Sequence, residues 1–368
     1  MGARMRVGII GCGNIFDQYI AGCRLFEVLE VIACADLDMQ RARQRAQQYS
    51  LQALTVDELL AHPDIEIVVN LTIPAAHRQV SLAAIAAGKH IYSEKPLAIT
   101  TAEGREILRA AAERGVRVGC APDTFLGGSL QTCIRLVSEG AIGTPVAATA
   151  FFATHGPESW HPNPAFYYQV GGGPVLDMGP YYLTALITML GSVRTVAGAS
   201  RTTFTQRTAT SPSRNGETFP VEVPTLSTAA LIFESGALGS VTFSFDLWAH
   251  HQPFIEIHGS EGSLSVPDPN HFTGRVQLYT SARAEQGWQD VPLSHPDQVG
   301  RGIGVADMAQ AILTGRAHRA NGQLAYHVLE VMEKLAGLGA EGMVQTIESR
   351  VEPPAPLPVG LTLGQLDA

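Results

Sequence analysis

A glycine-rich turn follows a short apolar run near the start of the sequence. Val7 to Phe16 reads Val-Gly-Ile-Ile-Gly-Cys-Gly-Asn-Ile-Phe, and an amphipathic stretch over 15–26 comes next. Glycines between a buried strand and a helix let backbone N–H groups approach a pyrophosphate, which the helix N-terminus also favours. Phe16 stands where a third glycine is usual, so the alternative is a simple glycine turn. The residues expected to line a dinucleotide site are Gly8, Gly11, Cys12, Gly13, Asn14 and Ile15.

An acidic residue ends the second apolar run. Asp36, followed by Leu37, lies about twenty residues beyond the glycines, where a carboxylate accepts hydrogen bonds from the adenosine ribose and repels a 2′-phosphate. We therefore expect both residues to contact NAD. NADP stays possible because Arg41 and Arg43 are close in sequence. The alternative for Asp36 is an N-cap of the next helix.

Lysine is scarce, which singles out one triplet. The chain has 25 basic residues, of which only three are lysines: Lys89, Lys95 and Lys334. Lys95 stands in Glu94-Lys95-Pro96, at the end of an apolar run where parallel sheets bind ligands. Lysine, unlike arginine, can lose its proton when its pKa is lowered. We expect Lys95 to act on the substrate, and the other two lysines to be surface residues.

Short β-branched runs and longer amphipathic stretches alternate in the first third of the chain. The expected strands are 6–10, 28–36, 65–71, 90–94 and 116–120, and the expected helices are 15–26, 38–49, 56–62, 75–87 and 101–114. This alternation predicts a doubly wound parallel sheet in an α/β fold.

Beyond residue 123 the pattern changes to long alternating stretches. After a helix at 130–138, these stretches are 146–154, 193–205, 225–233, 238–245, 254–259 and 275–279, with hairpin turns at 235–236 and 260–262. They predict a mostly antiparallel sheet, and helices at 305–314 and 325–339 follow it. The predicted domains are 1–121, a Rossmann domain, 122–350, a substrate-binding and oligomerisation domain, and 351–368, a tail.

Three motifs in order resemble the Gfo/Idh/MocA oxidoreductase family: the glycine turn, Glu94-Lys95-Pro96, and the stretch Gly171-Gly-Gly-Pro-Val-Leu-Asp177-Met-Gly179. The resemblance covers most of the chain. It implies a Rossmann domain, a second α/β domain with an open sheet, a nicotinamide cofactor, and a sugar, cyclitol or related polyol substrate. In this family the sheet face commonly builds dimers or tetramers. Further residues that the resemblance implies at the cofactor are Leu71, Thr72, Pro74, His77, Glu94 and Lys95.

The family's second motif usually reads Asp-x-x-x-His, and its histidine exchanges a proton with the reacting hydroxyl. Here the stretch is Asp177-Met-Gly-Pro-Tyr181, so a phenol replaces the imidazole. An unperturbed phenol has a pKa near 10 against about 6.5 for imidazole, so Tyr181 needs a cation such as Lys95, or Lys95 is itself the base. His161 is another possible replacement. Asp177 either fixes this geometry or caps a helix that begins at Pro180.

A polar, aromatic loop precedes this motif. Trp160, His161 and Tyr168 are residue types that grip sugars, by aromatic packing on C–H surfaces and by hydrogen bonds to hydroxyls. Asp123, after the run 116–120, is expected to face the nicotinamide ribose or the substrate. His250-His251 and Arg301 are placed in the second domain, within reach of the cleft.

The composition excludes several classes of protein. The net charge is −9 with no basic cluster, so neither nucleic acid nor an anionic membrane is an expected partner. Five scattered cysteines without C-x-x-C spacing argue against disulfides and zinc and favour the cytoplasm. No apolar run approaches the roughly 18 to 20 residues of a membrane span. No metal is expected, because adjacent histidines on a strand point to opposite faces.

These observations predict an NAD(P)-dependent dehydrogenase or reductase that acts on CH–OH groups of a sugar or polyol. Two alternatives remain. The missing histidine favours a nicotinamide-binding regulator without turnover, and an NAD-recycling glycosidase would oxidise its substrate only transiently. A homodimer or homotetramer is the expected assembly.

Overall fold

The computed structural model describes residues 3–367 and divides into two compact units. The first unit takes the chain up to Gln131, Leu293–Tyr326, and the segment from Pro354 onward. The second takes Thr132–Pro292 and His327–Pro353. This division differs from the predicted boundaries 1–121, 122–350 and 351–368, because two later segments of the chain return to the first unit.

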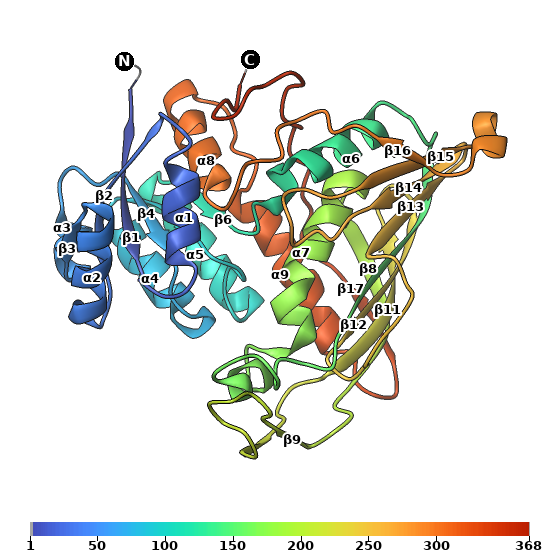
Figure 1. Ribbon diagram of the computed structural model, residues 1–368, viewed down its shortest axis with the longest axis horizontal. Coiled ribbons are helices and arrows are strands. Elements are labelled where there is room, and N and C mark those ends of the chain that lie inside the picture. The colour runs from blue at the N-terminus through green and yellow to red at the C-terminus, as the bar shows by residue number, and fades with distance from the viewer. Residues whose placement is uncertain (1–2, 368) are drawn as a thin grey trace. The chain divides into compact units, whose positions relative to one another are not determined.

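A six-stranded parallel sheet forms the centre of the first unit, in the order β3-β2-β1-β4-β5-β6 (Figure 1). Its strands are β1 (Met5–Ile10), β2 (Leu29–Ala35), β3 (Gln52–Leu54), β4 (Ile67–Asn70), β5 (His90–Ser93) and β6 (Val118–Cys120). All residues of β4 are buried, as expected for a strand covered on both faces. The strand order reverses between β1 and β4, and ligands bind at the carboxyl ends beside such a switch point. The predicted Rossmann fold is confirmed.

Five helices of the first unit precede β6 in the described residues, and side chains cap the starts of three of them. The five helices are α1 (Phe16–Cys23), α2 (Met39–Tyr49), α3 (Val56–Ala61), α4 (Pro74–Ala86) and α5 (Thr101–Arg114). Thr55 and Glu58 form a reciprocal capping box at α3, and Thr100 accepts the Glu103 N–H at α5. Pro74 opens α4, where its missing N–H costs no hydrogen bond.

Helix α8 (Ile303–Thr314) and the residues after it belong to the first unit, because backbone and ionic contacts hold them there. The Cys120 N–H donates to the Ala320 carbonyl at 3.0 Å, so the chain pairs with the edge strand β6. Asp307 of α8 is fully buried and pairs with Arg316 at 2.7 Å and with Arg319. The sequence pattern predicted a helix here but carried no sign of which sheet it would join.

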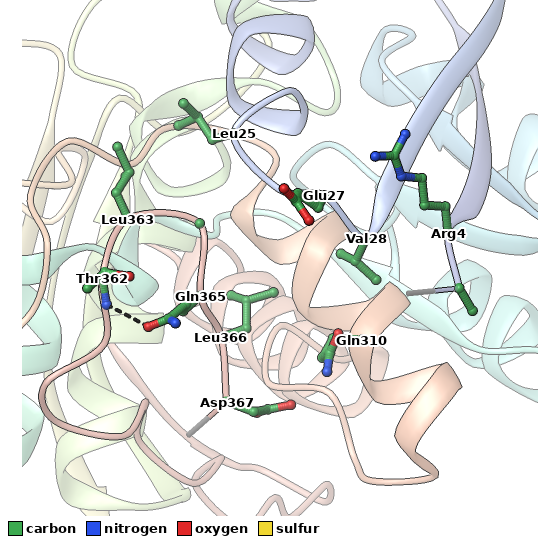
Figure 2. A pocket seen from close by; sticks show the side chains of 12 residues that line it. Arg4, Leu25, Glu27, Val28, Gln310, Thr362, Leu363, Gln365, Leu366 and Asp367 are labelled. Atoms are coloured by element: carbon green, nitrogen blue, oxygen red, sulfur yellow. Dashed lines mark hydrogen bonds between the residues drawn. The ribbon is translucent and has the colours of Figure 1, made fainter. Parts of the chain in front are cut away.

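The C-terminal segment also packs on this unit. The Leu357 N–H donates to Gln131 at 2.6 Å, and Asp367 pairs with Arg316 at 3.0 Å. Together with α8 and the residues before β1 and β2, this segment lines a hollow of about 580 Å³, in which Arg4, Glu27, Gln310 and Asp367 are labelled (Figure 2). The hollow lies at the amino ends of β1 and β2, whereas cofactors bind at carboxyl ends.

A nine-stranded sheet forms the second unit, in the order β16-β15-β14-β13-β7-β12-β11-β8-β17. Its strands are β7 (Pro145–Ala153), β8 (Val193–Arg201), β11 (Leu226–Phe233), β12 (Leu238–Ser244), β13 (Ile255–Gly259), β14 (Gly262–Val266), β15 (Val276–Thr280), β16 (Gln289–Val291) and β17 (Met343–Thr346). Only the β7–β12 pair is parallel among the ladders of this sheet in the described residues. The predicted, mostly antiparallel sheet is confirmed, and both predicted hairpin turns join neighbouring strands.

Helix α7 (Gly173–Leu190) packs on β7, β11 and β12. A small separate ladder pairs β9 (Gln206–Thr208) with β10 (Thr218–Pro220). The remaining helical elements are α6 (Gly128–Ser138), α9 (Gly322–Ala336), η1 (Thr124–Leu126), η2 (Pro164–Tyr168) and η3 (Ser281–Gln286).

Candidate functional site

The glycine turn between β1 and α1 leaves room for a ligand. Gly11 has φ +102°, and a Cβ there would stand 2.7 Å from the Leu71 carbonyl carbon, so only glycine fits against the end of β4. A Cβ on Gly13 would meet nothing in the described chain within 4 Å. Helix α1 follows with Ile15 as its N-cap, and no described side chain caps it. An open, uncapped helix N-terminus behind a glycine fits a pyrophosphate.

Phe16 fills the position of the usual third glycine and belongs to the core. Its side chain is fully buried, its ring centroid lies 5.9 Å from that of Tyr49, and the Arg45 guanidinium lies 5.7 Å from the Phe16 centroid. At this position helix α1 therefore packs through an aromatic side chain, and Gly11 keeps the positive φ of a tight turn.

Asp36 stands at the end of β2 and braces the glycine turn. Its Oδ2 accepts the Cys12 N–H at 2.8 Å, and its Oδ1 accepts the Asp38 N–H at 2.9 Å. The N-cap of α2 is Asp38, which accepts the N–H groups of Gln40 and Arg41. The alternative interpretation of Asp36 as an N-cap is therefore wrong. The neighbouring Leu37 is 97% exposed, so this end of the strand is open.

The turn after β4 is tied to the lysine triplet by His77. Asn70 Oδ1 accepts the Thr72 hydroxyl at 2.6 Å, and His77 Nε2 lies 3.0 Å from the Thr72 carbonyl oxygen. His77 Nδ1 lies 2.6 Å from the Pro96 carbonyl oxygen. The imidazole is fully buried, and burial lowers its pKa. These contacts brace the two turns against each other, and the cofactor contact expected for His77 stays a prediction. Thr72 and Pro74 keep part of their surface exposed.

Both oxygens of Glu94 are engaged by the protein. Oε1 accepts the Tyr19 hydroxyl at 2.8 Å and lies 3.5 Å from Arg301 Nη1, and Oε2 accepts the Lys95 N–H at 2.9 Å. Tyr19 is fully buried, and burial raises its pKa. The side chain of Glu94 is therefore engaged within the protein, and the expected contact of this residue with the cofactor stays a prediction.

Asp123 lies beneath this triplet rather than at the surface. It is fully buried, and its Oδ2 accepts the N–H groups of Gly302 and Gly304 at 2.8 and 3.1 Å. Burial raises its pKa to about 6, against the opposing effect of Arg301. Arg301 itself belongs to the first unit, which corrects its expected place in the second domain. Asp123 therefore holds the start of α8 by these two hydrogen bonds. Its side chain has no exposed surface that a substrate could contact.

Lys89 is not the surface residue that the sequence suggested. It is 8% exposed, and its Nζ donates to the carbonyls of His62 and Ile65, each at 2.7 Å. Burial lowers its pKa. The hydrogen bonds to these two carbonyl oxygens compensate for the burial of the Lys89 ammonium group.

Asp177 and Tyr181 lie one turn apart on α7 and thus share a face of the helix. Tyr181 is 4% exposed and Asp177 is half-buried. The helix begins at Gly173 with Pro174 in its first turn, and Pro180 lies inside it. The alternative that Asp177 caps a helix beginning at Pro180 is therefore wrong, because Asp177 itself lies inside a helix that has already begun at Gly173.

The aromatic loop separates into exposed and buried residues. Trp160 is 65% exposed, and its ring centroid lies 5.4 Å from that of His161. His161 Nδ1 accepts the Asn163 N–H at 3.0 Å, which leaves Nε2 as the ring nitrogen for other chemistry. Tyr168 is fully buried and donates to Glu158 at 2.9 Å, so it belongs to the core rather than to a sugar-binding surface.

Sequence reasoning missed Tyr19 as part of the site. The hydrogen bond from Tyr19 to Glu94 spans 75 positions of the chain, and no local pattern marks a tyrosine within a helix for such a contact. Arg301 was noticed only as a cation within reach of the cleft.

Metal-ligand clusters, disulfides and helices that could span a membrane are three features that the described residues lack. No three His, Cys, Asp or Glu side chains gather as metal ligands in residues 3–367. Each of the five cysteines is free and buried. Within the same described range, no helix has both the length and the apolar character needed to cross a membrane.

Curated relatives and a solved structure are similar to this chain over most of its length. A 1,5-anhydro-D-fructose reductase of Ensifer adhaerens is 29% identical over 78% of this chain and 83% of its own length. A dTDP-3,4-didehydro-2,6-dideoxy-alpha-D-glucose 3-reductase of Streptomyces violaceoruber is 28% identical over 77% of this chain and 87% of its own. A levoglucosan dehydrogenase solved with NADH and L-sorbose covers 94% of this chain and 99% of its own, with a TM-score of 0.82 and 22% identity, and shows the same fold.

Two family profiles match successive parts of the chain. Residues 5–121 match the oxidoreductase family with an NAD-binding Rossmann fold, and residues 130–265 match the GFO/IDH/MocA C-terminal domain. The glycine turn, the Glu94-Lys95-Pro96 triplet and the open sheet agree with both matches. The chain belongs to the Gfo/Idh/MocA family of NAD-binding oxidoreductases.

Proposed function

We propose that this chain is an NAD-dependent dehydrogenase or reductase that moves hydride between nicotinamide and a CH–OH carbon of a sugar or related polyol. The family supports the reaction class, and the two reductases named above act, by their names, on sugar derivatives. The observation that carries the proposal is the fixed backbone of Lys95, whose N–H is held by a buried Glu94 in the unit that contains the glycine turn.

The cofactor-binding residues follow from the geometry of the first unit. Gly13 and the uncapped start of α1 hold the pyrophosphate, and Asp36 accepts the adenosine ribose hydroxyls beside the exposed Leu37. Thr72 and Pro74 flank the same carboxyl edge of the sheet. When bound, the nicotinamide ring accepts or gives up the hydride. The Asp36 carboxylate repels a 2′-phosphate, so NAD is preferred over NADP.

The proton must be moved by side chains of this chain. Lys95 polarises the reacting oxygen, and Tyr181 relays the proton while Asp177, one turn away on α7, orients it by hydrogen bonding. A phenol can serve at neutral pH only where a cation stabilises its phenolate, so Tyr181 needs such a cation. His161 is the second candidate for the proton relay. Its Nδ1 accepts a backbone N–H in the turn, so Nε2 is the nitrogen that would take part in proton transfer. Trp160 packs against the substrate.

The open face of the second sheet supports a homo-oligomer. Thr149, Ser240, Ala230, Ala197 and Val344 stand in register across five neighbouring strands, and none of them is charged. Val344 is 71% exposed in the single chain. A flat row of small, uncharged side chains suits a self-complementary interface. Light scattering of an Ala230→Glu variant tests this, and we expect a smaller assembly than that of the wild type.

The remaining partners and the location follow from less direct observations. The acidic net charge favours neither nucleic acid nor an anionic membrane as a partner. Free, buried thiols suit a reducing compartment, so we propose the cytoplasm.

Turnover by Lys95 variants tests the function. Reduced-nicotinamide absorbance is followed with a panel of polyols, sugars, sugar acids and their keto forms. We expect Lys95→Ala to lose turnover about a thousandfold and to bind NADH nearly as the wild type does. Lys95→Arg keeps the positive charge, so it should be as harmful as Lys95→Ala only if a proton moves through Lys95 itself. Lys334→Ala is the control and keeps its activity.

Three results would overturn the assignment. Unchanged turnover in Lys95→Ala removes the catalytic role of the triplet. Binding of NADH without turnover of any substrate in the panel instead supports a regulator, which the replacement of the motif histidine by Tyr181 favours. Product formation without net nicotinamide reduction identifies a glycosidase.

A further inference from the structure

The second unit carries a hollow of about 370 Å³ beside β9, a strand labelled in Figure 1. This volume lies within the range of about 300 to 1,000 Å³ typical of small-molecule sites. The lining comes from three separate segments: the loop after β7, the strand β9 with its flanks, and the loop after β12. None of these lining residues is among those to which the proposed function gives a role.

One wall of the hollow is an aromatic stack. The Trp248 indole and the His155 imidazole lie parallel, with ring centroids 3.5 Å apart and an interplanar angle of 13°. Trp248 is 82% exposed, so the imidazole covers one face of the indole and the other face is open. Aromatic faces are electron-rich and attract the slightly positive C–H groups of a sugar ring. The stack holds the indole in one orientation, which lowers the entropy cost of binding.

A second wall consists of neutral hydrogen-bonding groups. Side chains alternate along a strand, so Gln206, Thr208 and Thr210 point to one side of the β9 segment while Arg207 and Ala209 are buried on the other. The first three are exposed, and the described residues offer their side chains no hydrogen-bond partner. An amide and two hydroxyls can each donate and accept, which suits the hydroxyls of a saccharide.

The base of the hollow is rigid and has no free positive charge. Arg207 pairs with Glu158, with Asp246 at 3.1 Å, and with the carbonyls of His155 and Phe245 at 2.6 and 2.8 Å. Its side chain is 6% exposed. One guanidinium facing two carboxylates leaves the cluster net negative. A phosphate or a sugar acid is therefore repelled, whereas a neutral ring is not.

We propose that this hollow binds a neutral sugar ring, with one face of the ring on Trp248 and ring hydroxyls bonded to Gln206, Thr208 and Thr210. The inference extends the proposed function by a second place of sugar contact. The ring belongs either to the distal unit of a glycoside substrate or to a separate saccharide, and the chemistry of recognition is the same for both.

Binding is measured on the full chain with the methyl β-glycosides of glucose, galactose and xylose, by tryptophan emission and by saturation transfer from protein to sugar C–H protons. We expect at least one glycoside to bind in the millimolar range, as a single stacking contact with a few hydrogen bonds allows. Trp248→Ala should weaken it by about tenfold or more, and glucose 6-phosphate should bind more weakly than the neutral sugar.

The matched control is Trp288→Ala. Trp288 is 40% exposed and contacts Tyr279 near the β15–β16 hairpin, away from the lining of the hollow. The Trp288→Ala variant should bind the glycoside as the wild type does. Because Trp248 is largely exposed, its loss should leave thermal unfolding unchanged, so a loss of binding reports on the hollow. Thr208→Val, which keeps the shape and removes the hydroxyl, should weaken binding severalfold.

Kinetics separate the two sources of the ring. If the ring is the distal unit of a glycoside substrate, Trp248→Ala raises KM for that glycoside. It then leaves kcat, and KM for the free monosaccharide, unchanged. If the ring belongs to a separate saccharide, Trp248→Ala leaves KM unchanged for every substrate, while the directly measured binding of the saccharide is lost.

The proposal fails if no glycoside binds, or if binding survives in Trp248→Ala. A change of oligomeric state in Trp248→Ala, without sugar binding in the wild type, assigns the indole to a contact between copies and also overturns it. The same titration in the Lys95→Ala background keeps the two hypotheses apart, because the hollow should bind sugar there while turnover is lost.

Discussion

Tyr19 donates a 2.8 Å hydrogen bond to Glu94, and this contact joins α1 to the end of β5. The second oxygen of the same carboxylate receives the Lys95 N–H. A helix that begins at the glycine turn is therefore linked, through one buried carboxylate, to the backbone of the lysine that we propose as the polarising group. Lys95 is thereby oriented by residues that need not touch the substrate.

We predict that Tyr19→Phe lowers the free energy of unfolding by about 2 kcal/mol, because a buried hydrogen bond to a charged group is lost. It should also lower kcat several-fold with little change in KM for NAD, since Lys95 loses part of its support. Tyr92→Phe is the control: Tyr92 is equally buried, and its hydroxyl has no hydrogen-bond partner among the described residues. Urea unfolding and steady-state kinetics measure both, and equal effects of the two variants would contradict this role of Tyr19.

Local signals explain which parts of the first unit the sequence predicted. Helix α5 was predicted with its observed bounds from Thr101 and Glu103 in its first turn, and the residue that caps it is Thr100, one position earlier. The three-residue strand β3 was missed, because so few residues carry no periodicity. The cap of α2 was considered for Asp36 as an alternative, although Asp38 performs it, since either acidic residue satisfies the sequence pattern.

Asp36 is predicted to set the preference for NAD. Replacing it by serine removes the charge that opposes a 2′-phosphate and releases Arg41, whose Nη1 lies 3.7 Å from Asp36 Oδ2. We expect kcat/KM for NAD to fall by about tenfold and kcat/KM for NADP to rise. Asp38→Ala, which removes the N-cap of α2, should cost about 1 kcal/mol of stability and leave the preference unchanged. An unaltered ratio of the two efficiencies in Asp36→Ser would refute this assignment.

The second unit was predicted less fully, for two physical reasons. Tyr168 and Trp160 are similar in type and close in sequence, yet one is fully buried and the other 65% exposed, because burial depends on partners such as Phe219 and Phe245 that come much later in the chain. A helix start at Pro180 was one of two alternatives, whereas α7 begins at Gly173 with Pro174 in its first turn, and either proline satisfies the local pattern.

The replacement of the motif histidine by Tyr181 makes a kinetic prediction. Tyr181→Phe should lower kcat by about a hundredfold, because proton transfer by a positioned side chain contributes on the order of 10² to 10⁴ in rate. Tyr181→His should recover part of the activity that Tyr181→Phe loses, and the limb of the pH profile that residue 181 sets should move toward neutral pH. His161→Ala should have a small effect. If instead His161→Ala abolishes turnover and Tyr181→Phe is active, His161 is the relay.

His327 is predicted to make the second unit sensitive to acid. Its Nε2 accepts the Val193 N–H at 3.0 Å, so that nitrogen must be unprotonated in the folded chain, and burial lowers its pKa to about 4. An unfolded chain binds the proton near pH 6.5, so stability is full above that pH and is lost as the pH falls toward 4, by on the order of 3 kcal/mol. His327→Gln offers an oxygen to the same N–H and does not titrate. Urea unfolding between pH 4.5 and 7 should show a flatter dependence for this variant than for the wild type, and parallel curves would show that His327 does not drive the acid sensitivity.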